Sequence, residues 1–308
     1  MGRTKALVAA VAVLVGAGML VVGVAAGAGA AYTPAADALL GGGSVGAQRT
    51  TDHLDVKFTT IRIQKDGKSL HFYGDWIARC DGNLLVTANF DQIVPIAADG
   101  SFSGTGPLNS EIADGTFEFN GKLSRIVLGG RSVEAARGTG RVNFSFHPDP
   151  AQPHACDTTV VNWQARTSPT ASGKATPRKG GSYYGNTSAT FPVVMRVSSN
   201  GKQVVQTGLE FVLKCAKREQ PSLEADITPT MSISRNGSFV NVEHYDERVR
   251  AAQIWGEGSV MKYTAVFRGK FGAWAVRGSL KVDATVVASD GTTLDTCSSG
   301  PLSFAASL

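Results

Sequence analysis

The sequence predicts an all-β protein with two tandem antiparallel β-sandwich domains, jelly-roll-like in outline, behind an N-terminal signal or anchor segment. Two observations support this fold class. Short runs of β-branched and aromatic residues alternate with polar residues and end at turn sequences such as Asp-Gly, with no helical period between them. The same landmarks also recur in the same order in both halves of the chain, which indicates an internal duplication.

Residues 1–30 are predicted to be a signal peptide or a membrane anchor. Arg3 and Lys5 form a short basic start, and no charged residue occurs from position 6 to position 31. The small residues at 28–30 suit a cleavage site, whereas the length of the apolar run also suits an uncleaved anchor that spans a bilayer. Both alternatives predict that the remainder of the chain is secreted or lies at the extracytoplasmic cell surface.

The net charge of the chain is too small to indicate a polyanionic partner. The formal net charge is +5, and removal of Arg3 and Lys5 with the N-terminal segment would lower it by two, to +3. Nucleic-acid binding depends on clustered basic residues, and the basic residues from Lys174 to Lys179 lie in a stretch rich in proline, serine and threonine. We therefore expect no nucleic-acid partner, and membrane contact only through an uncleaved N-terminal segment.

The first β-domain is predicted at residues 52–166, after a flexible spacer at residues 31–51 that is rich in glycine and alanine. Turns are indicated at Asp66-Gly67, Asp99-Gly100 and Asp114-Gly115, because Asp-Gly accepts the positive φ of tight turns. The strands expected in this domain are Leu54–Ile63, Leu70–Cys80, Leu85–Val94, Gly115–Leu123, Gly138–Phe146 and Thr159–Ala165.

A linker at residues 167–180 separates the first domain from its copy at residues 181–308. The sequence Gly-Ser-Phe begins at Gly100 and again at Gly237, which lie 20 and 22 residues after the first cysteine of each half. Further equivalent pairs follow in the same order: Gly121 and Gly269, Gly138 and Gly278, and Trp163 and Phe304. The pair of strands Phe72–Cys80 and Leu209–Cys215 is equivalent too, so the alternation predicts that Trp76 and Phe211 face the two cores.

The four cysteines are predicted to form two disulfides, one in each domain. An even number of cysteines in an exported chain indicates disulfide bonds. Four cysteines allow three pairings, and the duplication selects Cys80 with Cys156 and Cys215 with Cys297. A loop of this size is worth roughly 4 kcal/mol in the chain-entropy model. The wide cysteine spacing does not suit zinc, whose ligands occur in close pairs, and we expect no metal and no other cofactor.

The landmarks resemble those of an uncharacterised all-β, two-cysteine domain found in exported proteins of high-GC Gram-positive bacteria. In that family the late cysteine often reads Cys-Asp-Thr/Ser-Gly-x-Val-x-Trp-x-Ala. Residues 156–165 match this pattern closely, whereas the copy that begins at Cys297 departs from it. The resemblance covers both halves from about residue 55 to the end. Its motifs are structural, so it implies export and an all-β fold, but no particular activity.

The second domain carries an insertion that the first domain lacks. The interval from Gly237 to Gly269 is 32 residues, whereas the equivalent interval from Gly100 to Gly121 is 21. The extra chain, within Val240–Gly258, combines hydrogen-bonding groups with aromatic rings, and binding sites commonly lie on loops of a rigid β scaffold. The candidate ligand-binding residues are Glu243, His244, Tyr245, Asp246, Arg248, Arg250 and Trp255.

Each candidate surface has a structural alternative. The insertion would equally suit a solvated excursion with one short helix at Tyr245–Trp255, packed down through Val249, Ala252 and Trp255. The outward face of the strand Leu70–Cys80 suits either a polar binding face or an ordinary solvated sheet face.

Taken together, these features predict an exported, non-enzymatic binding or surface module whose partner is an extracellular carbohydrate or protein. The one Gly-x-Ser-x-Gly match, at residues 42–46, lies in the glycine-rich predicted spacer, where no strand-to-helix turn is expected. No His-Glu-x-x-His motif occurs, and no catalytic residue is assigned. Two alternatives stay open. One is a hydrolase that cleaves polysaccharide with paired carboxylates of the second domain. The other is a purely structural surface stalk.

Overall fold

The computed structural model describes residues 32–45, 56–110, 113–147, 152–168, 176–226 and 230–308. The predicted signal or anchor segment and half of the predicted linker, residues 169–175, lie outside these residues. In the described part of the chain, none of the helices has the length and apolar character needed to cross a membrane.

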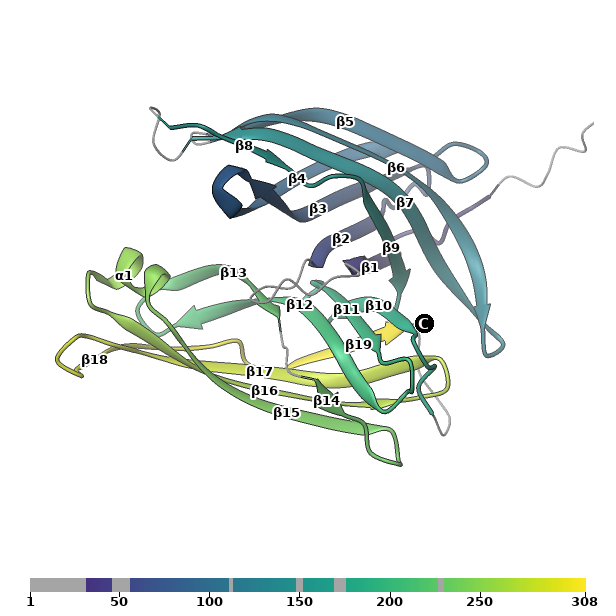
Figure 1. Cartoon of the computed structure of the whole chain (residues 1–308). Helices are drawn as coiled ribbons and strands as arrows, with labels where there is room; N and C mark the ends of the chain where they lie inside the picture. The colour runs from purple at the N-terminus through teal and green to yellow at the C-terminus, as the bar shows by residue number, and fades with distance from the viewer. Residues whose placement is uncertain (1–31, 46–55, 111–112, 148–151, 169–175, 227–229) are drawn as a thin grey trace, which may run out of the picture. The chain divides into compact units, whose positions relative to one another are not determined.

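The first sheet has nine strands and holds the N-terminal half of the chain (Figure 1). A short 3-10 turn, Asp81–Asn83, follows the third strand. The strands are β1 (Leu39–Val45), β2 (Val56–Ile63), β3 (Ser69–Cys80), β4 (Leu85–Pro95), β5 (Ser101–Ser110), β6 (Ala113–Leu128), β7 (Arg131–Phe146), β8 (His154–Asp157) and β9 (Val161–Thr167).

The second sheet has ten strands and holds the C-terminal half of the chain. One helix, α1 (Val249–Trp255), interrupts it. The strands are β10 (Ser182–Thr187), β11 (Pro192–Val197), β12 (Gln203–Cys215), β13 (Glu219–Asp226), β14 (Met231–Ser232), β15 (Ser238–Glu247), β16 (Val260–Phe271), β17 (Ala275–Val287), β18 (Thr293–Ser298) and β19 (Leu302–Ser307).

Both sheets are antiparallel meanders with the same strand order. The first runs β4-β3-β2-β1-β9-β7-β6-β5, and the second runs β13-β12-β11-β10-β19-β17-β16-β15. Each sheet therefore joins its first strand to its last and curls into a barrel. The all-β, two-domain prediction is confirmed, but the prediction of jelly-roll-like sandwiches is wrong. Strand lengths and turn spacing do not distinguish a sandwich from a barrel, because both have the same inward–outward alternation.

The predicted spacer contains an integral strand. Within it, β1 pairs with β2 on one side and with β9 on the other, and Leu40 is fully buried in the core. Tyr32 is also fixed, because its backbone N–H donates to the Ala98 carbonyl at 2.9 Å and its hydroxyl donates to buried Glu134. The glycines that suggested a spacer are required by close packing: a Cβ atom at Gly42 would lie 2.0 Å from the Gln164 carbonyl oxygen.

Aromatic residues fill the two cores as the alternation predicts. Trp76 and Trp163 are 0% and 1% exposed, and their equivalents Phe211 and Phe304 are 0% and 4% exposed. Trp76 satisfies its indole N–H by donating to Thr59 Oγ1 at 3.3 Å. These four rings are therefore structural, because a buried aromatic ring contributes mainly through packing.

The repeated glycines are explained by one local arrangement that both domains share. Gly121 pairs directly with Gly138 across β6 and β7, and Gly269 pairs with Gly278 across β16 and β17. A Cβ atom at Gly138 would lie 2.5 Å from the Trp163 ring, and one at Gly278 would lie 2.5 Å from the Phe304 ring. In each domain an aromatic ring packs directly against the glycine pair. The glycines and the aromatic residue therefore depend on each other and recur together in both halves of the sequence.

Both predicted disulfides are present. Cys80 is bonded to Cys156 and Cys215 to Cys297, and in each case the two cysteines are directly opposite each other on neighbouring strands. The bonds join β3 to β8 in the first domain and β12 to β18 in the second. The disulfide therefore links equivalent strands in the two domains.

Candidate functional site

The insertion of the second domain is mainly a strand and a helix rather than a loop. β15 continues through Glu247 and stays in register with β16 over its whole length. The extra residues then form α1 between β15 and β16. The prediction of a binding loop is therefore wrong about conformation, because β15 pairs with β16 residue by residue from Ser238 to Glu247.

β15 separates its side chains into an inner and an outer row. Phe239 begins the inner row and is 4% exposed in the core; by the two-residue period, Asn241, Glu243 and Tyr245 follow it. The outer row contains Val240 and Val242, which are 65% and 53% exposed, and then His244 and Asp246. Glu243 and Asp246 therefore lie on opposite faces of the strand.

Tyr245 lies against a buried aromatic partner. Its ring stacks on Tyr263 with the centroids 4.5 Å apart and the planes 8° from parallel. Burial of the phenol, with smaller contributions from the nearby carboxylates of Glu243 and Glu247, raises the pKa of Tyr245 to about 12. Because 42% of the residue surface stays exposed, solvent screening weakens the free energy linked to this pKa.

α1 packs onto the same core. Ala251 is fully buried within it, and Trp255, the last helical residue, is half-buried against it. The sequence predicted Ala252 rather than Ala251 as the inward residue. Arg248 precedes the helix and is exposed, and Arg250 lies within the helix.

Buried polar atoms without a hydrogen-bond partner among the described residues occur in both domains, and in the first they include Gln92 Oε1 and Trp163 Nε1. Four of those in the second domain lie on β12, β15 and α1. They are Thr207 Oγ1, Asn241 Nδ2, Glu243 Oε1 and Trp255 Nε1. Thr207 is 0% exposed and was not predicted as a site residue. The available signal was its equivalence to Phe72, since both lie eight residues before the first cysteine.

The remaining predicted residues do not join the inner group of the second domain, which is Asn241, Glu243, Tyr245 and Trp255. His244 Nδ1 lies 3.1 Å from Thr264 Oγ1 on the outer face of the sheet, and Asp246 is exposed on that face. The structure therefore divides the predicted set: Glu243, Tyr245 and Trp255 face the core, whereas His244, Asp246 and Arg248 are exposed.

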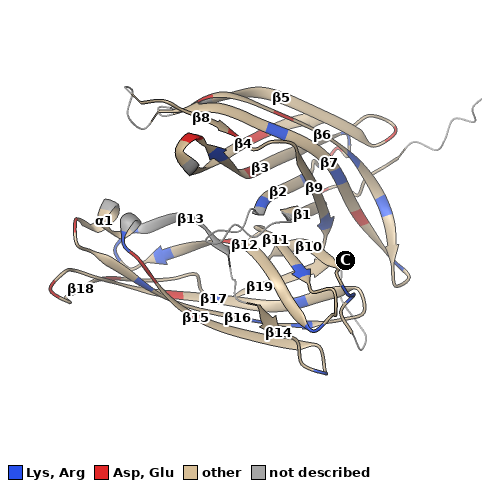
Figure 2. Ribbon diagram, in the orientation of Figure 1, with Lys and Arg blue, Asp and Glu red and all other residues tan. Residues whose placement is uncertain are grey.

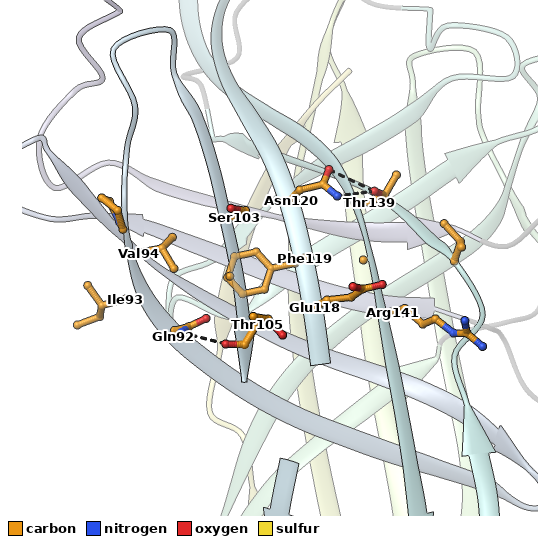
Figure 3. A pocket seen from close by; sticks show the side chains of 14 residues that line it. Gln92, Ile93, Val94, Ser103, Thr105, Glu118, Phe119, Asn120, Thr139 and Arg141 are labelled. Atoms are coloured by element: carbon orange, nitrogen blue, oxygen red, sulfur yellow. Dashed lines mark hydrogen bonds between the residues drawn. The ribbon is translucent and has the colours of Figure 1, made fainter. Parts of the chain in front are cut away.

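A separate groove of about 640 Å³ lies on the first domain, where β4 and β5 meet (Figure 3). Its floor is apolar, with Val94 and Phe119, and two hydroxyl or amide groups of its wall, Asn120 and Thr139, are hydrogen-bonded to each other at 3.0 Å. The other labelled residues of the groove are Gln92, Ile93, Ser103, Thr105, Glu118 and Arg141.

Several side chains of this groove are engaged within the protein, whereas Gln92 Oε1 is buried without a partner among the described residues. Gln92 Nε2 donates to the Thr105 carbonyl at 3.3 Å and so connects β4 to β5. Arg141 Nε donates to Asp157 Oδ1 at 3.0 Å, and this pair raises the pKa of Arg141. Because the Arg141 guanidinium and the Asn120 amide are already engaged within the protein, they are less available to a ligand than the inner group of the second domain.

Charged residues are scattered along both ribbons rather than gathered in one segment (Figure 2). Among the described residues, no group of three or more His, Cys, Asp or Glu side chains is placed to hold a metal ion. The chemistry available in the second domain is therefore hydrogen bonding and stacking by Asn241, Glu243, Tyr245 and Trp255.

Comparison with known proteins does not identify a relative. No family model, no curated protein and no solved structure matches the chain.

Proposed function

We propose that this protein is an exported, non-enzymatic binding module that recognises carbohydrate through its second domain. The observation that carries the proposal is the inner group formed by Asn241, Glu243, Tyr245 and Trp255. Three of these residues have buried polar atoms without a partner among the described residues. A buried donor or acceptor without a partner is unfavourable, so a ligand that supplies the partner gains affinity.

The composition of the inner group suits a sugar. Asn241 Nδ2 and Trp255 Nε1 are donors, Glu243 Oε1 is an acceptor, and sugar hydroxyls both donate and accept. The Tyr245–Tyr263 pair adds a flat aromatic surface, against which the C–H face of a sugar ring packs. A protein ligand would also meet these groups, but an inward-facing position favours a small polar group over a broad protein surface.

Export is part of the proposal. The two disulfides are typical of oxidising, extracytoplasmic compartments. Together with the basic and apolar N-terminal sequence they support a secreted or cell-surface location. Whether residues 1–30 are cleaved or anchor the chain does not change the proposed binding site.

The test is a glycan array probed with the purified chain from Tyr32 to Leu308. It must begin at Tyr32 because a chain that began at the predicted domain boundary, Asp52, would lack β1. We expect specific binding that Trp255→Ala and Glu243→Gln each lower at least tenfold. Asp246→Asn is the matched control, since this carboxylate lies on the outer face of the same strand, and it should bind as the wild type does.

The alternatives give different results in the same experiment. A hydrolase would release reducing ends from the bound polysaccharide, and this release would stop in Glu243→Gln. A structural stalk would give no specific signal on the array. Either result would overturn the proposed function.

A further inference from the structure

We infer that the ligand enters the interior of the second domain, between β12 and β15, and that the first domain is a non-binding copy whose equivalent interior is filled by aromatic rings. This inference rests on the proposed function and specifies it, because it assigns one site to the chain and places it inside the sheet. The two domains differ at equivalent positions of their interiors.

In the first domain, phenylalanine rings fill this part of the interior. Phe72 stacks on Phe119 with centroids 4.0 Å apart, and Phe90 stacks on Phe117 with centroids 4.6 Å apart. The inner positions of β5 next to these rings are glycines. A Cβ atom at Gly104 would lie 2.4 Å from the Phe119 ring, and one at Gly106 would lie 2.7 Å from the Phe117 ring. No side chain fits there beside the rings.

The second domain has the opposite distribution in the same register. Gly106 is opposite Phe117 in the first domain, whereas Glu243 is opposite Ala265 in the second. Gly104 is likewise replaced by Asn241. Two further positions change in the same sense, and the replacements are Thr207 for Phe72 and Tyr245 for Leu108. Rings have been lost and polar side chains have been added along one side of the interior.

Other inner positions have become more apolar. Leu209 and Leu280 occupy the positions of Gly74 and Gly140, and both leucines are buried in the core. Leu209 is the next inward residue after Thr207 on β12, and Leu280 lies on β17. The polar replacements therefore lie beside a core that stays apolar and closely packed.

Thr207 is the most informative residue in this set. It is 0% exposed, it projects into the sheet interior as Phe72 does, and its Oγ1 has no hydrogen-bond partner among the described residues. Glu243 Oε1 and Asn241 Nδ2 share this property on the facing strand β15. A ligand that reaches all three must be small at its tip and must both donate and accept. The terminal sugar of an oligosaccharide has this chemistry, because each of its hydroxyl groups both donates and accepts.

The experiment compares two buried threonines on the glycan array that tests the proposed function. Thr207→Val removes the unpartnered hydroxyl and keeps the shape. We expect it to raise the unfolding midpoint of the ligand-free protein and to lower the array signal at least tenfold. Thr59→Val is the matched control in the first domain, because Thr59 is equally buried but accepts a hydrogen bond from Trp76. It should lower the midpoint and leave the array signal unchanged.

A second variant restores the filled interior of the first domain. Ala265→Phe should abolish the array signal while near-ultraviolet circular dichroism stays native, and native mass spectrometry of the wild type should find one oligosaccharide per chain. Two oligosaccharides per chain, or a wild-type signal in both Thr207→Val and Ala265→Phe, would overturn the inference and leave the proposed function intact. Absence of any wild-type signal would refute the proposed function, and the inference with it.

Discussion

Individual residues differ between the two domains where function is proposed and agree where the fold requires them. The paired glycines beneath Trp163 and Phe304 are common to both copies, because a side chain there would collide with a ring. The inner positions of β15 are the ones that diverge. A sequence comparison of the two halves could therefore have singled out Asn241 and Thr207, which a search for exposed polar loops could not.

Tyr245 should lose its phenolic proton at a higher pH than an ordinary tyrosine does. Burial raises its pKa in the folded state to about 12 from the ordinary value of about 10, so the folded state holds a proton that the unfolded state releases between these values. The contribution of this residue to stability is complete below pH 10 and is lost as the pH rises towards 12. Absorbance titration of the phenolate band should lose a step near pH 12 in Tyr245→Phe, whereas the higher step of Tyr32, whose pKa burial and Glu134 also raise, should remain. An unchanged titration curve would contradict the burial of this phenol.

Gly278→Ala should destabilise the second domain. The added Cβ atom would lie 2.1 Å from the Arg268 carbonyl oxygen and 2.5 Å from the Phe304 ring, and the backbone oxygen cannot rotate away. We expect a loss of about 1–3 kcal/mol in the free energy of unfolding, as for other overpacked cores. Urea denaturation measures it. Arg277→Ala, at the exposed neighbouring position, is the control, and equal midpoints for the two variants would contradict the account.

At the scale of elements, most strands were predictable and the exceptions have physical reasons. The strands predicted at Leu70–Cys80 and Leu85–Val94 agree with β3 and β4 within a residue, because both alternate strictly and end at turns. β1 was missed because glycine provides no hydrophobic alternation. Its conformation is imposed by the two strands on either side of it, which is tertiary information.

Removal of β1 should therefore damage the first domain. A chain that begins at Asp52 loses Leu40 from the core and leaves β2 and β9 without a shared partner. We expect it to lose the near-ultraviolet signal of Trp76 and Trp163 at a lower denaturant concentration than the chain that begins at Tyr32. Coincident unfolding curves would show that the segment is a spacer after all.

The inner row of β15 marks the limit of sequence-based reasoning about the site. The candidate residues come from one stretch, yet alternation sends Glu243 and Asp246 to opposite faces of β15. Only the pairing of β15 with β16 and the burial of Phe239 show which face is inner. The prediction from the sequence described this stretch as a loop, and a loop does not separate its side chains into an inner and an outer row. Burial of Thr207 from β12 could not follow from the insertion at all, because the two strands are brought together by the fold.

At the scale of the whole molecule, the duplication provides two barrels of the same strand order, each with one disulfide bond. Because each disulfide lies within one domain, loss of one should affect that domain first. The double variant Cys215→Ala, Cys297→Ala should lower the unfolding free energy of the second domain by about 2–5 kcal/mol. Tryptophan fluorescence with Trp76 and Trp163 in one domain and Trp255 and Trp274 in the other resolves the two transitions. Peptide mapping without reductant that joined Cys80 to Cys215 would contradict the pairing.

A single site in the second domain limits how many ligands one chain can bind. A duplicated scaffold would offer avidity if both copies bound ligand, but the aromatic filling around Phe72 and Phe117 leaves the first domain as support. The chain would then bind one oligosaccharide, and multivalent attachment to a surface would require several chains.

The most direct test of the central claim is the array affinity of the wild type compared with two carboxylate variants of one strand. Glu243→Gln changes the inner face of β15 and Asp246→Asn changes the outer face. The account predicts at least a tenfold loss of binding for Glu243→Gln and none for Asp246→Asn. Equal binding by both variants, or a loss confined to Asp246→Asn, would contradict an interior carbohydrate site in the second domain.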